Sequence, residues 1–435
     1  MFHKIMINVG IIGFGTVGSG TAKILVNNKD HIREKTGIDI NLKKIADLDI
    51  EKDRGISLPK GVLTKDVKEI LNDPQIDIVV ETMGGITPAK NFIIEALNNK
   101  KHVVTANKAL LAQHGNELFG KANDLDLCLG FEASVAGGIP IIKVLREGLA
   151  ANKITDIYGI INGTSNYILS KMTKQGSNFS EALKEAQKLG FAEADPSFDI
   201  QGIDAAHKLT IMASLCFGIP LSYDKVYKEG IENITAQDIE FAKALGYKIK
   251  LLAIAKAANN ELELRVHPTM VPEYYLLSKV DDVFNAIYAV GDYVGPTLYY
   301  GSGAGQLPTG SAVVADIIDI AKNKQRQSKN LQLNMGNNDY KIKDMKDIES
   351  MYYFKFSALD KPNVLSQISG ALGAHNISIS AVMQKGRKVG ESVPVVVLTH
   401  RAKENNVLDA LSQIDRLNVV TDKTKYIRVE GKDIY

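Results

Sequence analysis

The sequence predicts an α/β protein of three successive parts: an open parallel sheet, a central α+β region and a small C-terminal βαββαβ unit. Three observations predict it. Strand-like and helix-like segments alternate through the first third of the chain, a glycine-rich motif follows the first strand, and two predicted helices separate four strands near the end. Such alternation is typical of parallel sheets, because each pair of parallel strands needs a crossover connection.

The composition of the chain limits the classes of protein to which it could belong. The chain has 435 residues, enough for two or three domains, and its 45% hydrophobic and 23% charged residues are those of a soluble globular protein. A net charge of +2 gives no basic field for nucleic acid, and no apolar run could cross a membrane. Two cysteines, Cys128 and Cys216, are too few for a disulfide scaffold and indicate a reducing, cytoplasmic location. Both lie in apolar surroundings, which favours buried structural thiols over catalytic ones.

A glycine-rich turn follows the first predicted strand. Residues 5–12 could resemble a secretory signal, but the run ends in this turn and not in a cleavage site, so we interpret it as a buried strand. Gly13 permits the tight turn, Gly15 lets the backbone approach a pyrophosphate, and Gly18 lets the following helix pack closely. The full motif is G-x-G-x-x-G, made of Gly13, Phe14, Gly15, Thr16, Val17 and Gly18. It predicts a Rossmann dinucleotide-binding domain.

The second strand, residues 42–46, ends at Asp47, where an acid usually holds the ribose 2′-hydroxyl of NAD. The distance from Gly18 is longer than usual, so we expect an extended first helix or loop. Lys52 and Arg54 could instead meet the 2′-phosphate of NADP, or could belong to a solvated loop. The choice between NAD and NADP therefore stays open.

Further strands are predicted over residues 76–81, 101–106 and 125–131, with Pro88 in the first turn of a helix. Ligands of open parallel sheets bind outside the carboxyl ends of the strands. Thr82 and Lys108 follow two such ends. A lysine at a helix start opposes the helix dipole, which favours a contact with substrate or nicotinamide over a place in solvent. After residue 131, Glu132 opens a loop of small residues, a candidate site for a monovalent cation bound by backbone carbonyls.

Four carboxylates and one lysine gather between residues 186 and 208: Glu193, Asp195, Asp199, Asp204 and Lys208. A helix is predicted to begin near Gln201. Asp204 and Lys208 are four residues apart and share a face with the apolar residues 211, 212 and 215, so we expect the pair to point inward. A semi-buried lysine beside a carboxylate can relay a proton or orient a polar substrate. The alternative is an ordinary surface ion pair.

The central region is predicted to form a sheet that carries the substrate pocket. Its predicted strands are residues 154–161, 283–290, 297–300 and a hairpin of 251–258 with 262–267; residues 162–166 form a turn that caps a helix. A second glycine-rich loop, residues 301–310, leads into a helix over residues 308–322 that we expect to pack on the first domain. The predicted domains are 1–135 (dinucleotide-binding, rejoined by the helix), 136–307 (catalytic and dimerisation) and 349–435.

Residues 323–348 are polar and are predicted to be a linker. Strands follow at 352–357, 377–383, 393–399 and 426–429, with helices at 362–372 and 407–414 and a turn at Lys385-Gly386. This is the ferredoxin-like order.

The segment 186–208 resembles the signature of homoserine dehydrogenases: A-x3-G, an acid, D-P, then D, G-x-D and a final lysine. Residues 105–108, 162–166 and 303–309 also resemble that family, and the likeness extends from Gly10 to about Ala321. The tail resembles an ACT regulatory domain, with residues 360–365 in the ligand-loop position. Where Asn363 stands the family usually has glycine, and asparagine also tolerates the left-handed backbone.

The resemblance implies roles for individual residues. Lys208 matches the catalytic proton donor and acceptor, Asp204 the substrate-orienting acid, and Lys108 a lysine near nicotinamide and substrate. Substrate contacts would come from Glu193, which holds the amino group, and from Asp199 and Gly163, while Asp195 and Asp199 could also be structural. Gly305 matches a cofactor contact. A sodium loop is implied at Glu132, Val135, Gly137 and Ile139, and an effector loop at Asp360, Asn363, Val364 and Leu365.

The implied reaction is the reversible NAD(P)H-dependent reduction of L-aspartate 4-semialdehyde to L-homoserine, in threonine, methionine and isoleucine biosynthesis. The resemblance also implies feedback by L-threonine and a homodimer or homotetramer, with no nucleic-acid or membrane partner. Two alternatives remain: an oxidoreductase for another amino-acid aldehyde or hydroxy acid, and a silent amino-acid sensor. A thiohemiacetal mechanism is disfavoured by the apolar surroundings of both cysteines.

Overall fold

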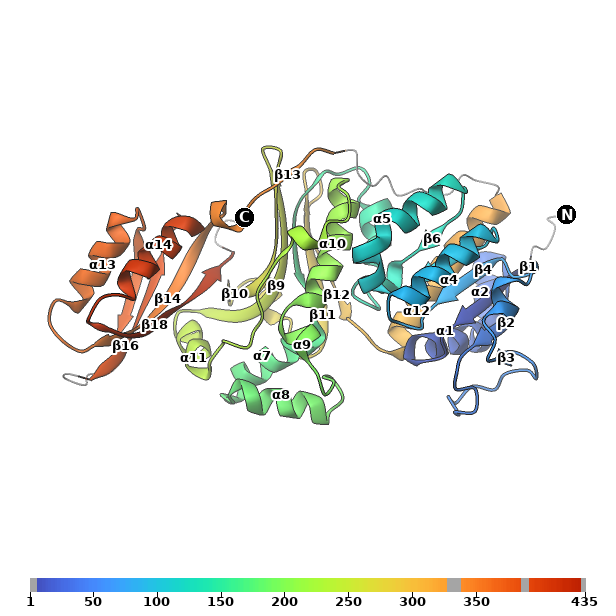
Figure 1. Ribbon diagram of the computed structural model, residues 1–435, viewed down its shortest axis with the longest axis horizontal. Coiled ribbons are helices and arrows are strands. Elements are labelled where there is room, and N and C mark those ends of the chain that lie inside the picture. The colour runs from blue at the N-terminus through green and yellow to red at the C-terminus, as the bar shows by residue number, and fades with distance from the viewer. Residues whose placement is uncertain (1–5, 327–337, 385–390, 432–435) are drawn as a thin grey trace. The chain divides into compact units, whose positions relative to one another are not determined.

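The computed structural model describes residues 6–326, 338–384 and 391–431 (Figure 1). The chain divides into two compact units. Unit 1 comprises Met1–Ile161, Asp204–Val226 and Phe284–Tyr340, and unit 2 comprises Asn162–Ile203, Tyr227–Val283 and Lys341–Tyr435.

Unit 1 contains a six-stranded sheet in which all neighbouring strands are parallel, in the order β3-β2-β1-β4-β5-β6. This order reverses direction beside β1 and is the Rossmann order, so the predicted dinucleotide-binding fold is confirmed. The strands are β1 (Met6–Ile12), β2 (Asp39–Ala46), β3 (Leu63–Thr64), β4 (Ile78–Glu81), β5 (His102–Thr105) and β6 (Leu129–Gly130).

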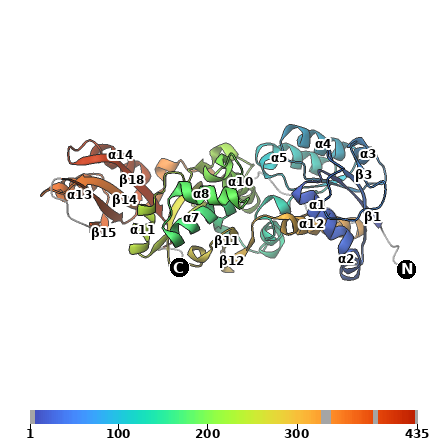
Figure 2. The ribbon, with the colours of Figure 1, turned by 90° about the horizontal axis from the view of Figure 1, so that it is seen from below.

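Two helices in succession, α1 (Thr16–Asn27) and α2 (Lys29–Thr36), connect β1 to β2. They account for the long predicted distance between the glycine motif and Asp47. Figures 1 and 2 show α1 with α12 (Gln306–Arg326) on one face of the sheet and α4 (Thr87–Asn98) with α5 (Lys108–Asp124) on the other. The other helical segments of unit 1 are α3 (Lys68–Leu71), η1 (Glu132–Ser134), α6 (Ile141–Lys143), η2 (Val144–Gly148), α10 (Ile203–Phe217) and η3 (Tyr223–Lys225).

The predicted strand over residues 125–131 is wrong in its first half. Helix α5 continues to Asp124, Leu125 follows as its C-cap, and only Leu129–Gly130 forms a strand. Asp126 adopts a left-handed φ of 53°, and the Leu127 N–H donates to the Ala122 carbonyl at 2.9 Å. This closure of a helix end uses the apolar residues that we interpreted as a strand.

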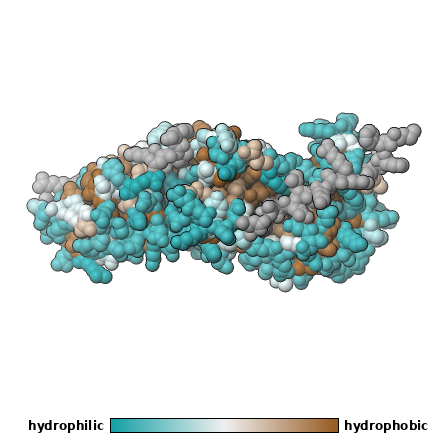
Figure 3. Space-filling view, turned by 90° about the horizontal axis from the view of Figure 1, so that it is seen from above, coloured by the Kyte–Doolittle hydropathy of each residue, from teal (hydrophilic) through white to brown (hydrophobic). Residues whose placement is uncertain are grey.

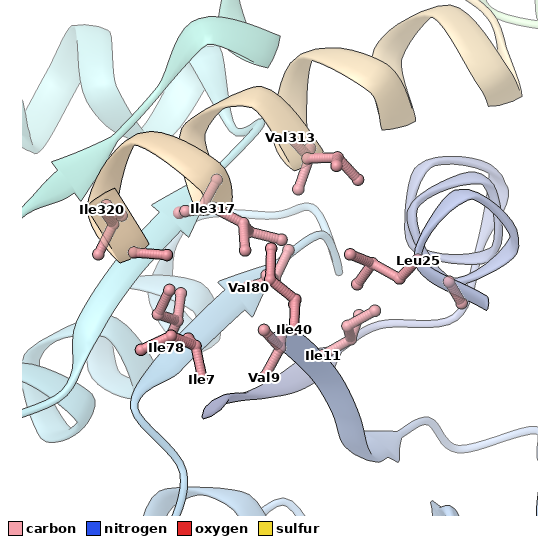
Figure 4. Close-up of a cluster of buried hydrophobic side chains, with 14 of the residues drawn as sticks. Ile7, Val9, Ile11, Leu25, Ile40, Ile78, Val80, Val313, Ile317 and Ile320 are labelled. Carbon is pink, nitrogen blue, oxygen red and sulfur yellow. The ribbon is translucent and has the colours of Figure 1, made fainter. Parts of the chain in front are cut away.

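The core of the Rossmann domain lies between the sheet and α12 (Figure 4). Alternate residues of β1, Ile7, Val9 and Ile11, are fully buried and belong to the same cluster as Val313 and Ile317 of α12. A helix from the second half of the sequence therefore covers one face of the N-terminal sheet. Unit 1 also contains three antiparallel strands in the order β12-β11-β7: β7 (Ile154–Ile160), β11 (Phe284–Gly291) and β12 (Gly295–Ser302).

Unit 2 is built on the hairpin of β9 (Tyr247–Ala258) and β10 (Glu261–Pro272). Its turn residues, Asn259 and Asn260, have φ values of 50° and 62°, as a two-residue hairpin turn requires. The predicted hairpin is confirmed, with longer strands than expected. The other elements before the tail are α7 (Gly163–Gln175), α8 (Phe179–Lys188), α9 (Ser197–Ile200), β8 (Tyr227–Lys228), α11 (Ala236–Ala244) and η4 (Leu276–Lys279).

The tail of unit 2 has the predicted βαββαβ order, with its long strands arranged β18-β14-β16-β15. Helices α13 and α14 pack on this sheet around a shared apolar core. Strand β18 also pairs with β10 in parallel, through Thr269 with Arg428. The elements are β14 (Glu349–Leu359), α13 (Val364–Ala374), β15 (Ile379–Gln384), β16 (Ser392–Thr399), β17 (Ala402–Lys403), α14 (Glu404–Ile414) and β18 (Val420–Val429).

The predicted linker 323–348 is only partly irregular. Helix α12 extends to Arg326, β13 (Lys341–Ile342) pairs with β10, and η5 (Met345–Asp347) precedes β14. Residues 327–337 of this segment, and the predicted Lys385-Gly386 turn, lie outside the described residues.

Among the described residues, no helix is both long and apolar enough to cross a membrane. On the face shown in Figure 3, hydrophilic side chains predominate and hydrophobic ones are visible in limited areas between them. This distribution agrees with the 23% of charged residues in the sequence.

Candidate active site

The glycine motif forms the turn between β1 and α1. Gly13 has a φ of +97°, and a Cβ on Gly18 would lie 1.9 Å from the Gly13 carbonyl oxygen. The Thr82 hydroxyl donates to the same oxygen at 2.8 Å. A Cβ on Gly15, by contrast, would meet no atom within 4 Å. Gly13 and Gly18 therefore hold the turn closed, while Gly15 leaves its outer side open, as a bound pyrophosphate requires.

Around this turn, Phe14 is buried, Thr16 is exposed and Val17 is half-buried. The free N–H groups at the start of α1, which Gly15 precedes, offer an anion site.

Asp47 and Arg54 both contact the glycine turn. The Phe14 N–H donates to Asp47 Oδ2 at 2.5 Å, and the Arg54 guanidinium donates to the Phe14 carbonyl and lies 4.8 Å from the centre of its ring. Arg54 and Asp47 also form an ion pair at 3.4 Å. Lys52, by contrast, is exposed. The structure thus selects Arg54 over Lys52 as the cation beside the nucleotide turn.

Asp204 of α10 lies between two lysines, Lys208 of the same helix and Lys108 of α5. Lys208 Nζ donates to Asp204 Oδ2 at 2.7 Å and to the Ile161 carbonyl at 2.7 Å. Lys108 Nζ lies 3.1 Å from the other carboxylate oxygen, Oδ1. The side chains of Asp204 and Lys208 are 5% and 10% exposed, and that of Lys108 is 33% exposed. The predicted inward-facing pair is therefore present, and it has a third member from a distant helix.

The position of Lys108 is fixed by its neighbour. Asn107 caps α5 by accepting the Leu110 N–H at 3.1 Å, and its side chain donates to the Gly85 carbonyl at 2.6 Å. A cation in the first turn of a helix opposes the helix dipole, and here Asp204 supplies the compensating charge.

In unit 2, Asn162 joins the predicted turn to Asp199. The Asn162 side chain caps α7 by accepting the Ser165 N–H at 2.8 Å, as predicted, and donates to Asp199 Oδ1 at 2.7 Å. Gly163 follows the cap, and a Cβ there would lie 2.8 Å from the Val283 carbonyl oxygen. The turn therefore has no room for a larger residue at Gly163.

The other two carboxylates of the cluster differ from Asp199. Glu193 is exposed. Asp195 accepts both the N–H and the hydroxyl of Ser197, which together lower its pKa. Asp195 therefore stabilises the turn before α9 through Ser197, a role that the sequence alone did not separate from catalysis.

The Glu132 loop is buried and strained. Ala136 and Gly137 have φ values of 54° and 47°, and Val135 and Ile139 are buried. The Glu132 carboxylate accepts the N–H groups of Ile142 and Lys143, each at 2.8 Å. Burial raises its pKa, against the effect of these two bonds. Within the described ranges no three His, Cys, Asp or Glu side chains form a metal cluster, so a cation here would depend on backbone oxygens.

Gly305 has a φ of +128° and opens α12. The next residue, Gln306, donates its side-chain amide to the Ser19 hydroxyl of α1 at 2.9 Å. The second glycine-rich loop thus lies beside the helix of the nucleotide turn. Neither thiol suits nucleophilic chemistry, because burial raises the pKa of Cys128 to about 12 and also raises that of Cys216.

Comparison with known proteins identifies the family. Three family models match: the homoserine dehydrogenase NAD binding domain over residues 13–130, homoserine dehydrogenase over residues 140–318, and the ACT domain over residues 352–416. The homoserine dehydrogenase of Neisseria gonorrhoeae is 46% identical over 430 residues, which cover 98% of this chain and 99% of that protein. The Pseudomonas aeruginosa enzyme is 45% identical over 98% of this chain and 99% of its own. The chain belongs to the homoserine dehydrogenase family.

Solved homoserine dehydrogenases have the same fold. The Thiobacillus denitrificans structure matches with a TM-score of 0.93 and 46% identity, covering 99% of this chain and all of that one. The Staphylococcus aureus structure at pH 7.5 matches with a TM-score of 0.77 and 37% identity, covering 99% of this chain and all of that one. As a homoserine dehydrogenase the chain is an oxidoreductase, and it carries an NAD-binding domain and a C-terminal ACT domain.

In the ACT domain of this homoserine dehydrogenase, Asn363 has a left-handed φ of 73° at the start of α13. This is the conformation for which glycine is usual, so the departure from the family pattern leaves the backbone shape intact. Asp360 lies just beyond β14, Val364 is buried, and Leu365 is 44% exposed.

One of the buried acids that the sequence did not single out lies close to the nucleotide turn of this homoserine dehydrogenase. Glu81, the last residue of β4, is fully buried and accepts hydrogen bonds from Thr105 and Met83. The signal that could have identified it is an acid at the carboxyl end of a parallel strand, as at Asp47.

Proposed function

We propose that the protein catalyses the reversible NAD(P)-dependent interconversion of L-homoserine and L-aspartate 4-semialdehyde, a step in threonine, methionine and isoleucine biosynthesis. In the oxidising direction, homoserine and NAD(P)+ give the semialdehyde, NAD(P)H and a proton. The observation that carries the proposal is the buried Asp204 carboxylate with Lys208 and Lys108 on its two oxygens. Membership of the homoserine dehydrogenase family supports L-homoserine as the substrate.

As a neutral amine, Lys208 takes the proton of the substrate hydroxyl in oxidation, and as an ammonium it returns that proton to the carbonyl oxygen in reduction. The Ile161 carbonyl and Asp204 hold its Nζ from two sides, which fixes the position from which the proton moves. Lys108, the more exposed lysine, stabilises the oxygen while it carries negative charge. The bound nicotinamide supplies or accepts the hydride.

Three further residues are assigned to substrate binding, as the resemblance to the family implies. Glu193 has an exposed carboxylate that suits the amino group of homoserine. Asp199, held by Asn162, and the restricted turn at Gly163 shape the place where the polar end of the substrate binds. We assign Asp195 to support of α9.

The coenzyme binds at the turn of residues 13–18, with Thr82 and Gly305 beside it. Asp47 suits a ribose hydroxyl and Arg54 a 2′-phosphate, so we propose that both NAD and NADP are accepted. A similar structure, a hyperthermophilic archaeal homoserine dehydrogenase, is a complex with NADPH; it is 26% identical with a TM-score of 0.58 and covers 73% of this chain.

We assign a sodium ion to the loop of Glu132, Val135, Gly137 and Ile139. The support is that residues 136 and 137 have consecutive left-handed φ values in a buried segment, and such backbone strain often accompanies ligand sites. The ion would fix this loop and would take no part in proton transfer.

The ACT domain, residues 349–435, binds an amino-acid effector, L-threonine, at Asp360, Asn363, Val364 and Leu365. We assign residues 1–135 with the α12 segment to coenzyme binding and residues 136–307 to catalysis and formation of a homodimer or homotetramer. Both cysteines are free thiols in the structure, which suits the cytoplasm.

The test is absorbance at the reduced-nicotinamide band. Purified protein receives L-homoserine with NAD or NADP, and L-threonine is added in parallel. We expect reduction with homoserine and not with L-serine or L-threonine as substrates, and inhibition by L-threonine. If the coenzyme were reduced with another hydroxy amino acid and not with L-homoserine, the proposed substrate would be wrong. No reduction in either direction, with L-threonine binding still measurable by calorimetry, would instead favour the amino-acid sensor.

A further inference from the structure

Glu81 is a buried carboxylate that no assigned role explains. It ends β4, is 0% exposed, and forms no ion pair in the part of the chain that the structure describes. Burial raises its pKa, and the hydrogen bonds that it accepts work in the opposite direction. An uncompensated buried acid is costly, and an apolar residue could fill the same space. Its hydrogen-bond partners indicate what it does.

The two oxygens of Glu81 serve two different loops. Oε1 accepts the Met83 N–H at 2.9 Å, in the loop that follows β4. Oε2 accepts the Thr105 hydroxyl at 2.6 Å, at the end of the neighbouring strand β5, where Glu81 and Thr105 are register partners. Only a group with two acceptor oxygens can hold both donors, because a glutamine amide would present a donor to one of them.

From Thr105 the hydrogen bonds continue to Lys108. The Thr105 hydroxyl accepts the Asn107 N–H at 3.0 Å, and Asn107 caps the helix that begins at Lys108. The Asn107 side chain also donates to the Gly85 carbonyl at 2.6 Å, which joins the two loops. Glu81, Thr105, Asn107 and the segment 83–85 therefore form a closed ring of bonds beneath the start of α5.

From Met83 the ring reaches the nucleotide turn. The neighbouring Thr82 donates its hydroxyl to the Gly13 carbonyl at 2.8 Å. Both loops that flank the expected nicotinamide position are thus anchored to one buried side chain.

We propose that Glu81 is a positioning residue for hydride transfer. Through Thr105 and Asn107 it fixes the ammonium of Lys108 against Asp204, and through Met83 it fixes the loop that carries Thr82. The inference rests on the proposed function, since it takes Lys108 to act in the reaction. Displacement of a catalytic group by about 1 Å can cost about 10²-fold in rate.

A double-mutant cycle tests this dependence. We expect Glu81→Gln to lower kcat/KM by about 10- to 100-fold, mainly through kcat. In a Lys108→Ala background, the same substitution should cost several-fold less than in the wild type, because only its effect through Met83 on the Thr82 loop remains. Thr105→Val breaks the ring from its other side and should show the same dependence on Lys108.

The control is Val80→Ala, in the same strand and equally buried but apolar. It should lower the melting temperature while kcat/KM of the folded enzyme changes less than threefold. Equal losses from Glu81→Gln in both backgrounds, or no loss from it, would overturn the inference. An inactive wild-type enzyme would instead contradict the proposed function, so the two failures are distinguishable.

Discussion

Asp204 is a buried carboxylate that faces a lysine on each oxygen, at 2.7 Å to Lys208 and 3.1 Å to Lys108. A buried charge is tolerated when it is paired and hydrogen-bonded. In the proposed reaction, Lys208 becomes a cation when it takes the proton, and Lys108 then provides a second positive charge close to it. Positive groups at this place would stabilise an oxygen that becomes negative when its proton moves.

Removal of the Lys208 amine should therefore abolish proton transfer and leave coenzyme binding intact. We expect Lys208→Ala to lower kcat by about 10² to 10⁴-fold. Affinity for NADPH, followed by its fluorescence, should change less than twofold, because the nucleotide turn is formed by other residues. Turnover near the wild-type value would exclude Lys208 from the chemistry.

Arg54 is the residue whose contacts should distinguish the two coenzymes. Its guanidinium is held over Phe14 beside Asp47, and we have proposed that it binds a 2′-phosphate. Arg54→Ala should raise KM for NADP about tenfold or more and change KM for NAD less than threefold, as measured by initial rates with each coenzyme. Lys52→Ala, two residues away and exposed, is the matched control and should change neither. Equal effects on both coenzymes would refute a 2′-phosphate contact.

At the scale of elements, α1 and α12 pack so closely that glycine is required at their contact. A Cβ on Gly20 would lie 2.0 Å from the Gln306 carbonyl oxygen, and one on Gly310 would lie 2.7 Å from the Gly20 carbonyl carbon. The contact joins the helix of the nucleotide turn to the helix that follows the second glycine loop. It therefore ties Gly305 to the coenzyme site.

Gly20→Ala should force these helices apart. Because backbone atoms cannot give way easily, we expect a loss of about 1–3 kcal/mol in the free energy of unfolding and weaker binding of coenzyme. Gly120→Ala in α5 is the matched control, since a Cβ there meets no atom within 4 Å. It should stabilise the protein by about 0.5–1 kcal/mol, as a helical glycine replaced by alanine does. Thermal unfolding with and without NADPH measures both, and a neutral Gly20→Ala would show that the helices separate freely.

At the scale of a whole unit, ion pairs attach the ACT domain to the β9–β10 hairpin. Arg265 and Lys256 contact Glu430 at 2.6 and 2.7 Å, just beyond β18. Arg428 of β18 pairs with Glu404 of α14 and, at 2.8 Å, with Glu229 beside β8. The attachment therefore depends on buried charges as well as on the pairing of β10 with β18.

Stability of unit 2 should consequently fall in acid. Burial would raise the pKa of Glu430, but Lys256 and Arg265 together lower it to about 2 from the usual 4.5. A lowered folded-state pKa contributes stability above pH 4.5, and this is lost as pH falls from about 4.5 to 2. Glu430→Gln should lower the free energy of unfolding by about 3–5 kcal/mol at pH 7. Between about pH 4.5 and 2, the variant should then lose less stability than the wild type.

Urea unfolding between pH 7 and pH 2.5 tests this expectation. Glu261→Gln on β10, which removes a partly exposed partner of Lys343, should lower the free energy of unfolding by about 1 kcal/mol or less. If the stability of Glu430→Gln fell with pH as steeply as that of the wild type, the role of the ion pairs of Glu430 would be refuted.

The sequence by itself determined the features that depend on short-range patterns. Strand, glycine turn and helix predicted the nucleotide site, the i,i+4 spacing predicted the Lys208–Asp204 pair, and the polar turn of residues 162–166 was recognised as a helix cap. Each needs only neighbours along the chain, because periodicity and turn chemistry act over a few residues. The wrong strand before residue 129 shows the limit, since an apolar helix end and an apolar strand look alike.

Only the tertiary structure decided which distant groups meet. Strand order brings Glu81 to Thr105, helix packing brings Lys108 to Asp204, and the turn after β2 brings Arg54, and not Lys52, to Phe14. Local patterns indicated Lys108 as a candidate, but they do not say which distant group each of these residues meets. The physical reason is that burial and pairing are properties of the packed chain, and they turn an ordinary acid or lysine into part of a site.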